Sequence, residues 1–143
     1  QAALAADAAP LTAEVVAADT LILGVPLYNF GIPSGLKAWL DQVIRAGATW
    51  KEGPDGARPL LSGKTAFVLS AATDAASPCA GGGCIEQVRP ALTAALRLLG
   101  AETVDFLHAD DQAADGPTAE RGRQDAIWRI DRLTEAPTLK RAA

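Results

Sequence analysis

Short, almost wholly apolar runs alternate with amphipathic helical patterns along this chain. The runs lie at residues 20–25, 65–69 and 103–107, and the first two carry a polar residue only at the start. Such runs are typical of strands covered on two faces, whereas Asp105 interrupts the third and indicates an edge strand. Because a helical pattern separates successive runs, the crossovers are right-handed and the strands parallel. The sequence therefore predicts an α/β fold, a parallel sheet with helices on both faces.

Capping residues suggest where the helices between the runs begin and end. Thr12 is expected to cap a short first helix, and Ser34 an amphipathic helix that Gly47 closes. The third helix is expected to end at Gly100 and the fourth to begin near Pro117. The long stretch 47–63, rich in Gly and Pro, is expected to be a structureless loop.

Composition and charge exclude several classes of protein. The chain has 143 residues, 49% of them hydrophobic, and its 13 basic and 17 acidic side chains give a net charge of −4. Interspersed charges of both signs exclude a disordered acidic tail and a basic nucleic-acid-binding arm. The longest apolar run, 21–27, is far shorter than the ~18 residues of a membrane span. We therefore expect one globular domain that binds neither nucleic acid nor membrane.

The beginning of the chain predicts a larger domain. The sequence contains no methionine, so position 1 is not a translation start. Three strands alone would leave both faces and an edge of a parallel sheet under-protected. We therefore expect residues 1–143 to be the C-terminal portion of a domain whose first two strands precede them. Two cysteines without a signal peptide indicate a cytoplasmic protein.

The segment that leaves the first predicted strand is the main candidate for a binding site. Pro26 ends the strand, and Tyr28, Asn29 and Phe30 then present two aromatic rings and an amide before the next helix begins. Ligands of open parallel sheets bind at the carboxyl ends of the strands, where helix N-termini offer N–H donors. The segment suits a ligand with a flat ring and acceptor atoms. A plain turn is the alternative.

A family resemblance rests on this segment and its surroundings. The stretch 18–41, with Gly-Val-Pro-Leu-Tyr-Asn-Phe-Gly-Ile-Pro-Ser-Gly-Leu-Lys inside it, is followed by Arg-Ala-Gly-Ala-Thr-Trp at 45–50 and Ser-Gly-Lys-Thr at 62–65. In this combination the chain resembles the FMN-dependent NADH:quinone oxidoreductases, also called NADH-azoreductases. The resemblance extends from about residue 18 to the last predicted helix. It implies a flavodoxin-like fold that lacks its first two strands.

The resemblance also implies which residues form the site. Two loops would contact the flavin, with backbone N–H groups near Asn29 and Gly31 facing its polar edge, and two further side chains would line the substrate pocket. The flavin-contacting residues would be Pro26, Leu27, Tyr28, Asn29, Phe30 and Gly31 in the first loop and Ser70, Ala71, Ala72 and Thr73 in the second, with Trp50 and His108 in the pocket. The second loop departs from the family's Ser-Arg-Gly-Gly. The family's Ser-rich phosphate loop has no counterpart here.

The chemistry implied by the resemblance needs no catalytic side chain. NADH would reduce FMN by hydride transfer, and a quinone would then take two electrons at the same face in ping-pong order. An aromatic azo compound would need two such cycles to give two amines. The family implies a homodimer with flavin at the subunit interface. Two alternatives remain: a flavodoxin-type electron carrier, or an incomplete chain that does not hold FMN.

The two cysteines are open to several interpretations. Cys79 and Cys84 are not spaced as Cys-x-x-Cys, and a zinc site needs about four ligands in a chain with one histidine. Structural thiols are the simplest interpretation, with a loop disulfide or a metal site as alternatives, and we expect no metal. His108 is likewise either a solvated strand-end residue or a lining of the pocket.

Overall fold

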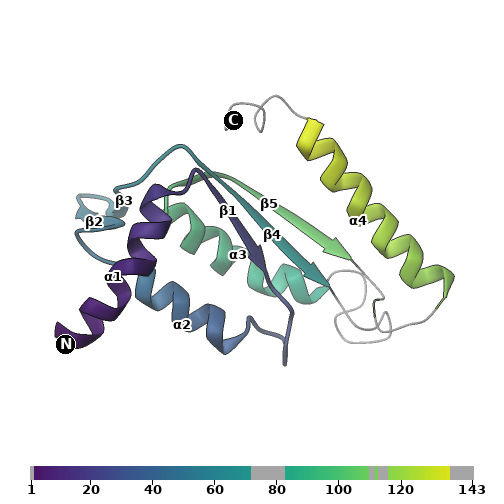
Figure 1. Cartoon of the computed structure of the whole chain (residues 1–143), viewed down its shortest axis with the longest axis horizontal. Coiled ribbons are helices and arrows are strands. Elements are labelled where there is room, and N and C mark those ends of the chain that lie inside the picture. Colours follow the sequence, from purple (N-terminus) through teal and green to yellow (C-terminus); the bar gives the residue numbers. More distant parts are fainter. Residues whose placement is uncertain (1, 72–82, 110–111, 113–115, 136–143) are drawn as a thin grey trace.

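The computed structural model describes residues 2–71, 83–109, 112 and 116–135 of the chain (Figure 1). The described helices and strands follow one another as α1 (Ala2–Ala17), β1 (Thr20–Gly24), α2 (Ser34–Val43), β2 (Trp50–Gly53), β3 (Gly56–Pro59), β4 (Lys64–Ala71), α3 (Gly83–Leu98), β5 (Ala101–Ala109) and α4 (Pro117–Glu135). In this part of the chain no helix is both long enough and apolar enough to cross a membrane.

The three predicted strands form one parallel sheet in the order β1-β4-β5. Leu21 of β1 is aligned with Ala66 of β4, and Phe67 of β4 is aligned with Asp105 of β5. The α/β prediction is therefore confirmed. Asp105 lies on an outer strand of this sheet, as its charge indicated.

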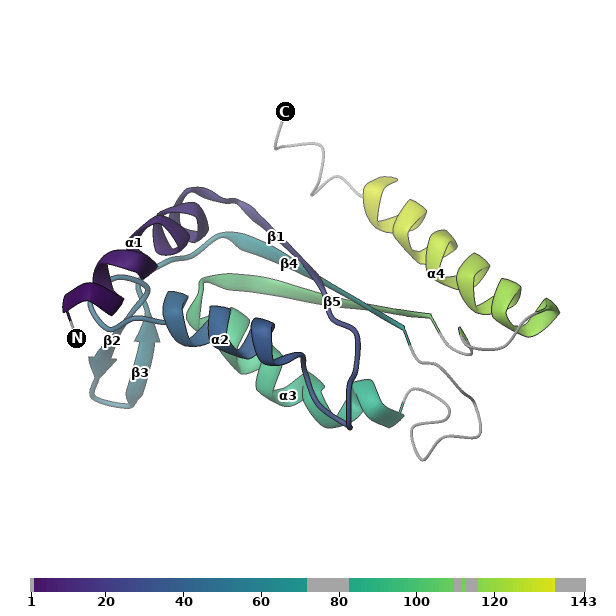
Figure 2. The same ribbon diagram turned by 60° about the horizontal axis from the view of Figure 1, so that its bottom comes forward.

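The helices cover the sheet unequally. Figures 1 and 2 show α2 and α3 beneath one face of the sheet and α4 on the other side. The core lies on the α2–α3 face, where Leu92 and Leu96 of α3 are buried with Ala66 and Val68 of β4. Burying such aliphatic side chains stabilises the fold by about 1.5–3 kcal/mol each. The carboxyl ends of the strands are held against this core.

The face of β1 turned away from the core is open, contrary to the expectation of two covered faces. Ile22 is 71% exposed, because α4 packs mainly on β5. A wholly apolar groove remains between α4 and the sheet; it is lined by Thr20, Ile22, Phe67, Leu69, Leu107, Ile130 and Leu133.

The first helix does not begin where the sequence indicated. It spans Ala2–Ala17, so Thr12 lies within it rather than at its N-cap. The Thr12 hydroxyl donates to the carbonyl of Ala8, four residues back, at 2.9 Å. A threonine hydroxyl inside a helix commonly makes this bond, and alanine-rich sequence upstream extends the helix.

The capping residues predicted for α2 were also wrong. Pro33 is the N-cap and Ser34 the first helical residue, and the helix ends at Val43 rather than at Gly47. Thr49 supplies the reason, because its fully buried hydroxyl accepts from the Arg45 N–H at 2.8 Å and donates to the Val43 carbonyl at 2.9 Å. These bonds satisfy backbone groups beyond the helix end and turn the chain away.

The stretch 47–63 is not a structureless loop. It contains an antiparallel hairpin in which Trp50 of β2 is aligned with Pro59 of β3, and Gly53 with Gly56. Gly56 adopts a φ of 107° at the tip, a conformation that glycine accepts without strain. The short strands carry little periodicity, so the sequence did not indicate them.

The last two helices agree with their predicted ends. α3 ends at Leu98, and Gly100 follows with a φ of 91°. A Cβ at Gly100 would lie 2.6 Å from the Leu61 carbonyl carbon, so both conformation and space require glycine. α4 begins at Pro117. Proline suits this position because the N–H of the first helical residue has no partner within the helix, so its absence costs nothing.

Candidate functional site

The candidate site lies at the carboxyl edge of the sheet, where β1, β4 and β5 end side by side (Figure 1). Three segments approach this edge: the loop after β1, the ends of β4 and β5, and the beginning of α3. In parallel α/β sheets this edge is where ligands bind.

The loop after β1 is closed by a tight turn over residues 28–31. Tyr28 N–H donates to the Gly31 carbonyl at 3.1 Å, and Gly31 N–H donates to the Tyr28 carbonyl at 2.9 Å. The two central residues have positive φ angles, 48° at Asn29 and 65° at Phe30, as in a type I′ turn. Asparagine tolerates this region, whereas a phenylalanine there is strained.

The turn holds two aromatic rings in solvent. Tyr28 is 62% and Phe30 57% exposed, and the Asn29 side chain is also exposed. Leu27, by contrast, packs partly against the core. Strain together with exposed aromatic rings at the carboxyl edge points to a binding role, because neither feature stabilises the free chain.

Two of the expected hydrogen-bond donors are already engaged within this turn. The N–H groups of Tyr28 and Gly31 donate to each other's carbonyls, and the predicted contact of backbone N–H groups near Asn29 and Gly31 with the flavin stays a prediction. Asn29 and Phe30 carry the remaining candidate N–H groups, together with the Asn29 side-chain amide.

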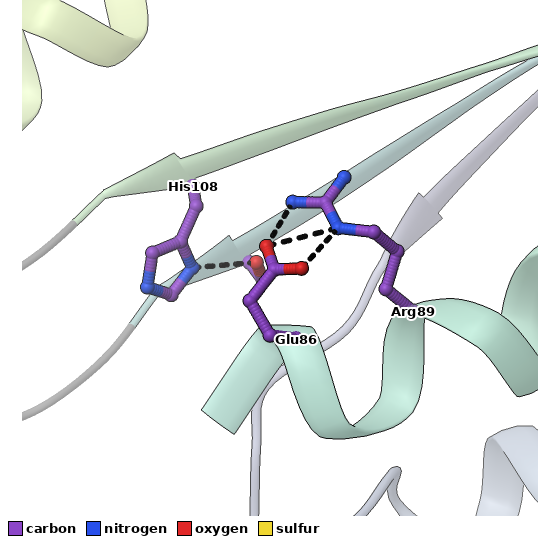
Figure 3. A network of polar contacts seen from close by, with 4 residues as sticks. Glu86, Arg89 and His108 are labelled. Atoms are coloured by element: carbon purple, nitrogen blue, oxygen red, sulfur yellow. Dashed lines mark hydrogen bonds and ion pairs between the residues drawn. The ribbon is translucent and has the colours of Figure 1, made fainter. Parts of the chain in front are cut away.

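The ends of β4 and β5 are joined by a hydrogen bond between side chains. Ser70 and His108 are register partners, and Ser70 Oγ lies 2.7 Å from His108 Nδ1 (Figure 3). Ser70 is 8% exposed. The sheet thus brings together one residue predicted to contact the cofactor and one predicted to line the pocket, although the sequence did not predict their bond.

An ion pair on the first turns of α3 lies next to this bond (Figure 3). Arg89 Nη2 donates to Glu86 Oε1 at 2.7 Å, and the Arg89 guanidinium lies 4.2 Å from the centre of the Phe106 ring. Hydrogen bonds from Arg89 outweigh desolvation and hold the pKa of Glu86 below its ordinary value of 4.5, and His108 acts in the same direction. This pair was not predicted from the sequence, although Glu-x-x-Arg spacing in a helix that follows a strand's carboxyl end could have suggested it.

Trp50 is not brought to this edge within one chain. It lies half-buried in the β2–β3 hairpin, and Figures 1 and 2 both show that hairpin at the opposite end of the sheet, beside α1. The reason is connectivity, because α2 carries the chain back to the amino ends of the strands before Trp50. Trp50 and the Tyr28–Gly31 turn therefore lie far apart within one chain.

The remaining predicted site residues lie at or just after strand ends, or outside the described residues. Pro26 is exposed at the end of β1, and Ala71 is the last residue of β4. Ala72, Thr73 and Cys79 lie outside the described residues, and of Cys84 only the backbone position in α3 is described. Their predicted roles stay predictions.

Comparison with known proteins identifies the family. Residues 1–133 match the family described as having a flavodoxin-like fold, and the chain therefore belongs to it. It is 45% identical over 114 residues to an FMN-dependent NADH:quinone oxidoreductase of Azotobacter vinelandii, an alignment that covers 78% of this chain and 54% of the relative. A second such enzyme, of Pseudomonas fluorescens, is 42% identical over 86% of this chain and 60% of its own length.

A solved structure supports the fold. An FMN-dependent NADH-azoreductase from Bacillus anthracis in complex with FMN superposes with a TM-score of 0.71 at 22% identity, over 92% of this chain and 63% of that one. The resemblance derived from the Tyr-Asn-Phe segment is thereby confirmed. The chain spans little more than half the length of the curated relatives it matches.

The residues at the carboxyl edge fit the ring system of FMN. The exposed rings of Tyr28 and Phe30 offer flat apolar surfaces, and the exposed Asn29 side chain offers a donor and an acceptor beside them. A Ser-rich cradle for the phosphate is absent from the sequence. The fit therefore concerns the ring and not the phosphate.

Proposed function

We propose that the protein is an FMN-dependent NADH:quinone oxidoreductase that also cleaves aromatic azo compounds. The names of its relatives support the quinone reductase activity, and the azoreductase whose structure superposes on the chain motivates the azo cleavage. The observation that carries the proposal is the strained Tyr28–Gly31 turn, which holds two aromatic rings in solvent at the edge where ligands of this fold class bind.

In this proposal the chain binds and orients the cofactor and supplies no nucleophile. Bound FMN would accept a hydride from NADH and deliver two electrons to a quinone. Tyr28 and Phe30 would pack against the ring, and the Asn29 amide would bond to its polar edge. NADH and the acceptor would use the site in turn. Double-reciprocal plots of initial rate against NADH concentration, at several quinone concentrations, should therefore give the parallel lines of ping-pong kinetics.

A homodimer completes the proposed site. Trp50 lies at the far end of the sheet from the turn, so a second copy would have to supply the Trp50 ring that lines the substrate pocket. We also propose a cytoplasmic location. Sedimentation of the protein as a monomer at micromolar concentration would contradict the dimer.

Cofactor binding is tested with FMN itself. Titration of FMN with the protein should quench flavin fluorescence, and saturating FMN should raise the Tm. Asn29→Ala should weaken binding, whereas Asp125→Ala, an exposed change on α4, should not. If the unaltered chain shows neither quenching nor thermal protection, the alternative of a chain that holds no FMN is correct.

Turnover distinguishes an enzyme from an electron carrier. With FMN bound, steady oxidation of NADH by a simple quinone supports the reductase. Bound FMN without such turnover would instead favour a flavodoxin-type carrier.

A further inference from the structure

An open groove of about 400 Å³ lies between α2 and α3, the two helices that pack on the core face of the sheet (Figures 1 and 2). Its floor is apolar, because Leu40, Val88 and Leu92 line it and are buried. Its rim is polar, with exposed Lys37 and Asp41 of α2 on one side. An apolar centre inside a polar rim is the usual composition of a protein–protein interface.

The α2 rim of this groove carries two opposite charges in an ion pair. Lys37 Nζ donates to Asp41 Oδ1 at 2.6 Å, and both side chains are more than half exposed. An exposed pair of this kind contributes little to the stability of one chain. Positions 37 and 41 lie about 6 Å apart along the helix axis, so the rim presents a positive and a negative site about one helical turn apart.

The order of these charges makes the rim complementary to a second copy of itself. A two-fold axis brings the same patch of two copies together. With the axis perpendicular to α2 and level with residue 39, the two α2 helices run antiparallel. Lys37 then faces the partner's Asp41, and Asp41 faces the partner's Lys37. The four charges alternate in sign, and such a network contributes more than an isolated surface pair.

We propose that a second copy of this chain docks on the α2–α3 groove, with the two α2 helices antiparallel. The inference rests on the homodimer of the proposed function and names its surface. Ala91 and Ala95 line the α3 side of the groove with small side chains, which leave space for the incoming helix. A small apolar ligand would cover the floor but match neither charge on the rim. A second copy matches both charges and covers the floor as well.

The antiparallel arrangement also suits the proposed substrate pocket. α2 follows the Tyr28–Gly31 turn, and the β2–β3 hairpin with Trp50 follows α2 at the opposite end of the sheet (Figure 1). Antiparallel α2 helices therefore bring the hairpin of each copy toward the turn of the other. Docking on this groove would thus let a second copy supply Trp50, as the proposed function requires.

Charge reversal at the rim tests the contact between copies. Sedimentation equilibrium at micromolar concentration should give a dimer for the unaltered chain. Lys37→Glu leaves two negative positions on the rim, and Asp41→Lys leaves two positive ones. Each variant alone should therefore dissociate, with a dissociation constant raised by about tenfold or more. Both residues are exposed, and circular dichroism checks that each variant is folded.

A mixture of these two variants separates contact between copies from an effect within one helix. When a Lys37→Glu copy pairs with an Asp41→Lys copy, each negative position faces a positive one. The equimolar mixture should recover the dimer, although each helix still carries like charges. Variants that stay dimeric alone, or a mixture that stays monomeric, would overturn the proposal.

Substitutions on α3 test the groove itself. Ala91→Glu places a charge at the groove, whereas Ala94→Glu places the same charge at an exposed position of α3 outside it. Ala91→Glu should give a monomer, and Ala94→Glu should remain a dimer. Equal behaviour of the two variants would overturn the groove as the docking surface.

FMN fluorescence quenching, measured on the same samples, keeps this inference distinct from the proposed function. A dimer that binds FMN and is unaffected by all these variants would overturn the α2–α3 surface and leave the proposed enzyme standing. A monomeric unaltered chain would leave the groove to a small ligand and overturn both the homodimer and this surface. Absence of quenching would overturn the proposed cofactor, and sedimentation would still decide the docking surface.

Discussion

At the scale of single residues, Phe30 shows a conflict between stability and binding. Its φ of 65° places a bulky residue in the left-handed region, and 57% of the side chain is exposed. Its ring therefore gains little from burial while its backbone is strained by about 1–2 kcal/mol. Such a conflict is expected where a side chain is kept for a ligand.

Phe30→Gly should therefore stabilise the free chain and weaken cofactor binding. Removing the strain should raise the free energy of unfolding by about 0.5–1 kcal/mol, after the entropy that glycine adds to the unfolded state. Urea denaturation and FMN fluorescence quenching measure the two effects. Loss of stability together with unchanged FMN affinity would contradict the role given to the turn.

Thr49 is a residue whose importance lies in its hydroxyl. Thr49→Val should lower the free energy of unfolding by about 1–3 kcal/mol, because the part-buried Arg45 N–H and the buried Val43 carbonyl lose their partner. Thr12→Val is the matched control. The Thr12 hydroxyl bonds to the carbonyl of Ala8 within a helix, and its loss should cost much less. Equal effects in urea denaturation would disprove this distinction.

At the scale of elements, the junction of α3 and β5 depends on Gly100. Gly100→Ala should destabilise the protein by about 2–4 kcal/mol, the sum of left-handed strain and a clash with the Leu61 backbone. Gly47→Ala adds the same methyl group at a φ of 79° with open space around it. It should cost only about 1–2 kcal/mol. The difference between the urea denaturation midpoints of Gly100→Ala and Gly47→Ala measures the clash of the added methyl group with the Leu61 backbone.

The Glu120–Arg123 ion pair of α4 makes one contribution to stability depend on pH in a predictable direction. Hydrogen bonds from Arg123 and Gln124 lower the pKa of Glu120 from its ordinary 4.5. The charged carboxylate therefore stabilises the fold above that value, and the contribution is lost as the pH falls through the lowered pKa. Arg123→Ala should move the pKa of Glu120 back toward 4.5 in a carbon-13 NMR titration. An unchanged value would show that Arg123 does not act on it.

At the scale of the whole molecule, one face of the sheet is incompletely covered. The groove between α4 and the sheet is lined wholly by apolar surface, and Ile22 is far more exposed than an aliphatic residue in a buried parallel strand. The core on the other face is complete by comparison, with Leu92, Leu96 and Leu99 fully buried. The α2–α3 face of the sheet thus carries the buried core, and the α4 face carries the exposed apolar surface.

The exposed apolar surface predicts that an apolar dye binds in the groove between α4 and the sheet. The chain should enhance the fluorescence of an apolar dye such as ANS, and Ile22→Glu should reduce that enhancement. Ile127→Glu, an exposed change on α4 outside the residues that line the groove, is the control and should leave the signal nearly unchanged. Equal losses in both variants would place the dye elsewhere.

Much of the secondary structure was predictable because periodicity is a local property. The three apolar runs became β1, β4 and β5, and α3 ended at Leu98, just before the predicted stop at Gly100. The error at Thr12 arose because alanine-rich sequence upstream extends α1 to Ala2. The error at Ser34 arose because the neighbouring Pro33 takes the N-cap position. The β2–β3 hairpin was not predicted because strands of four residues show little periodicity.

The sequence by itself determined the class of fold and the Tyr28–Phe30 segment, because apolar periodicity and a rare run of residues can be recognised without knowing distances. The tertiary structure alone decided which residues meet. It paired Ser70 with His108, 38 residues apart, through the register of parallel strands. It also placed Trp50 at the opposite end of the sheet, since a helix reverses the chain between β1 and the hairpin. Such contacts follow from strand order and register, which no local pattern encodes.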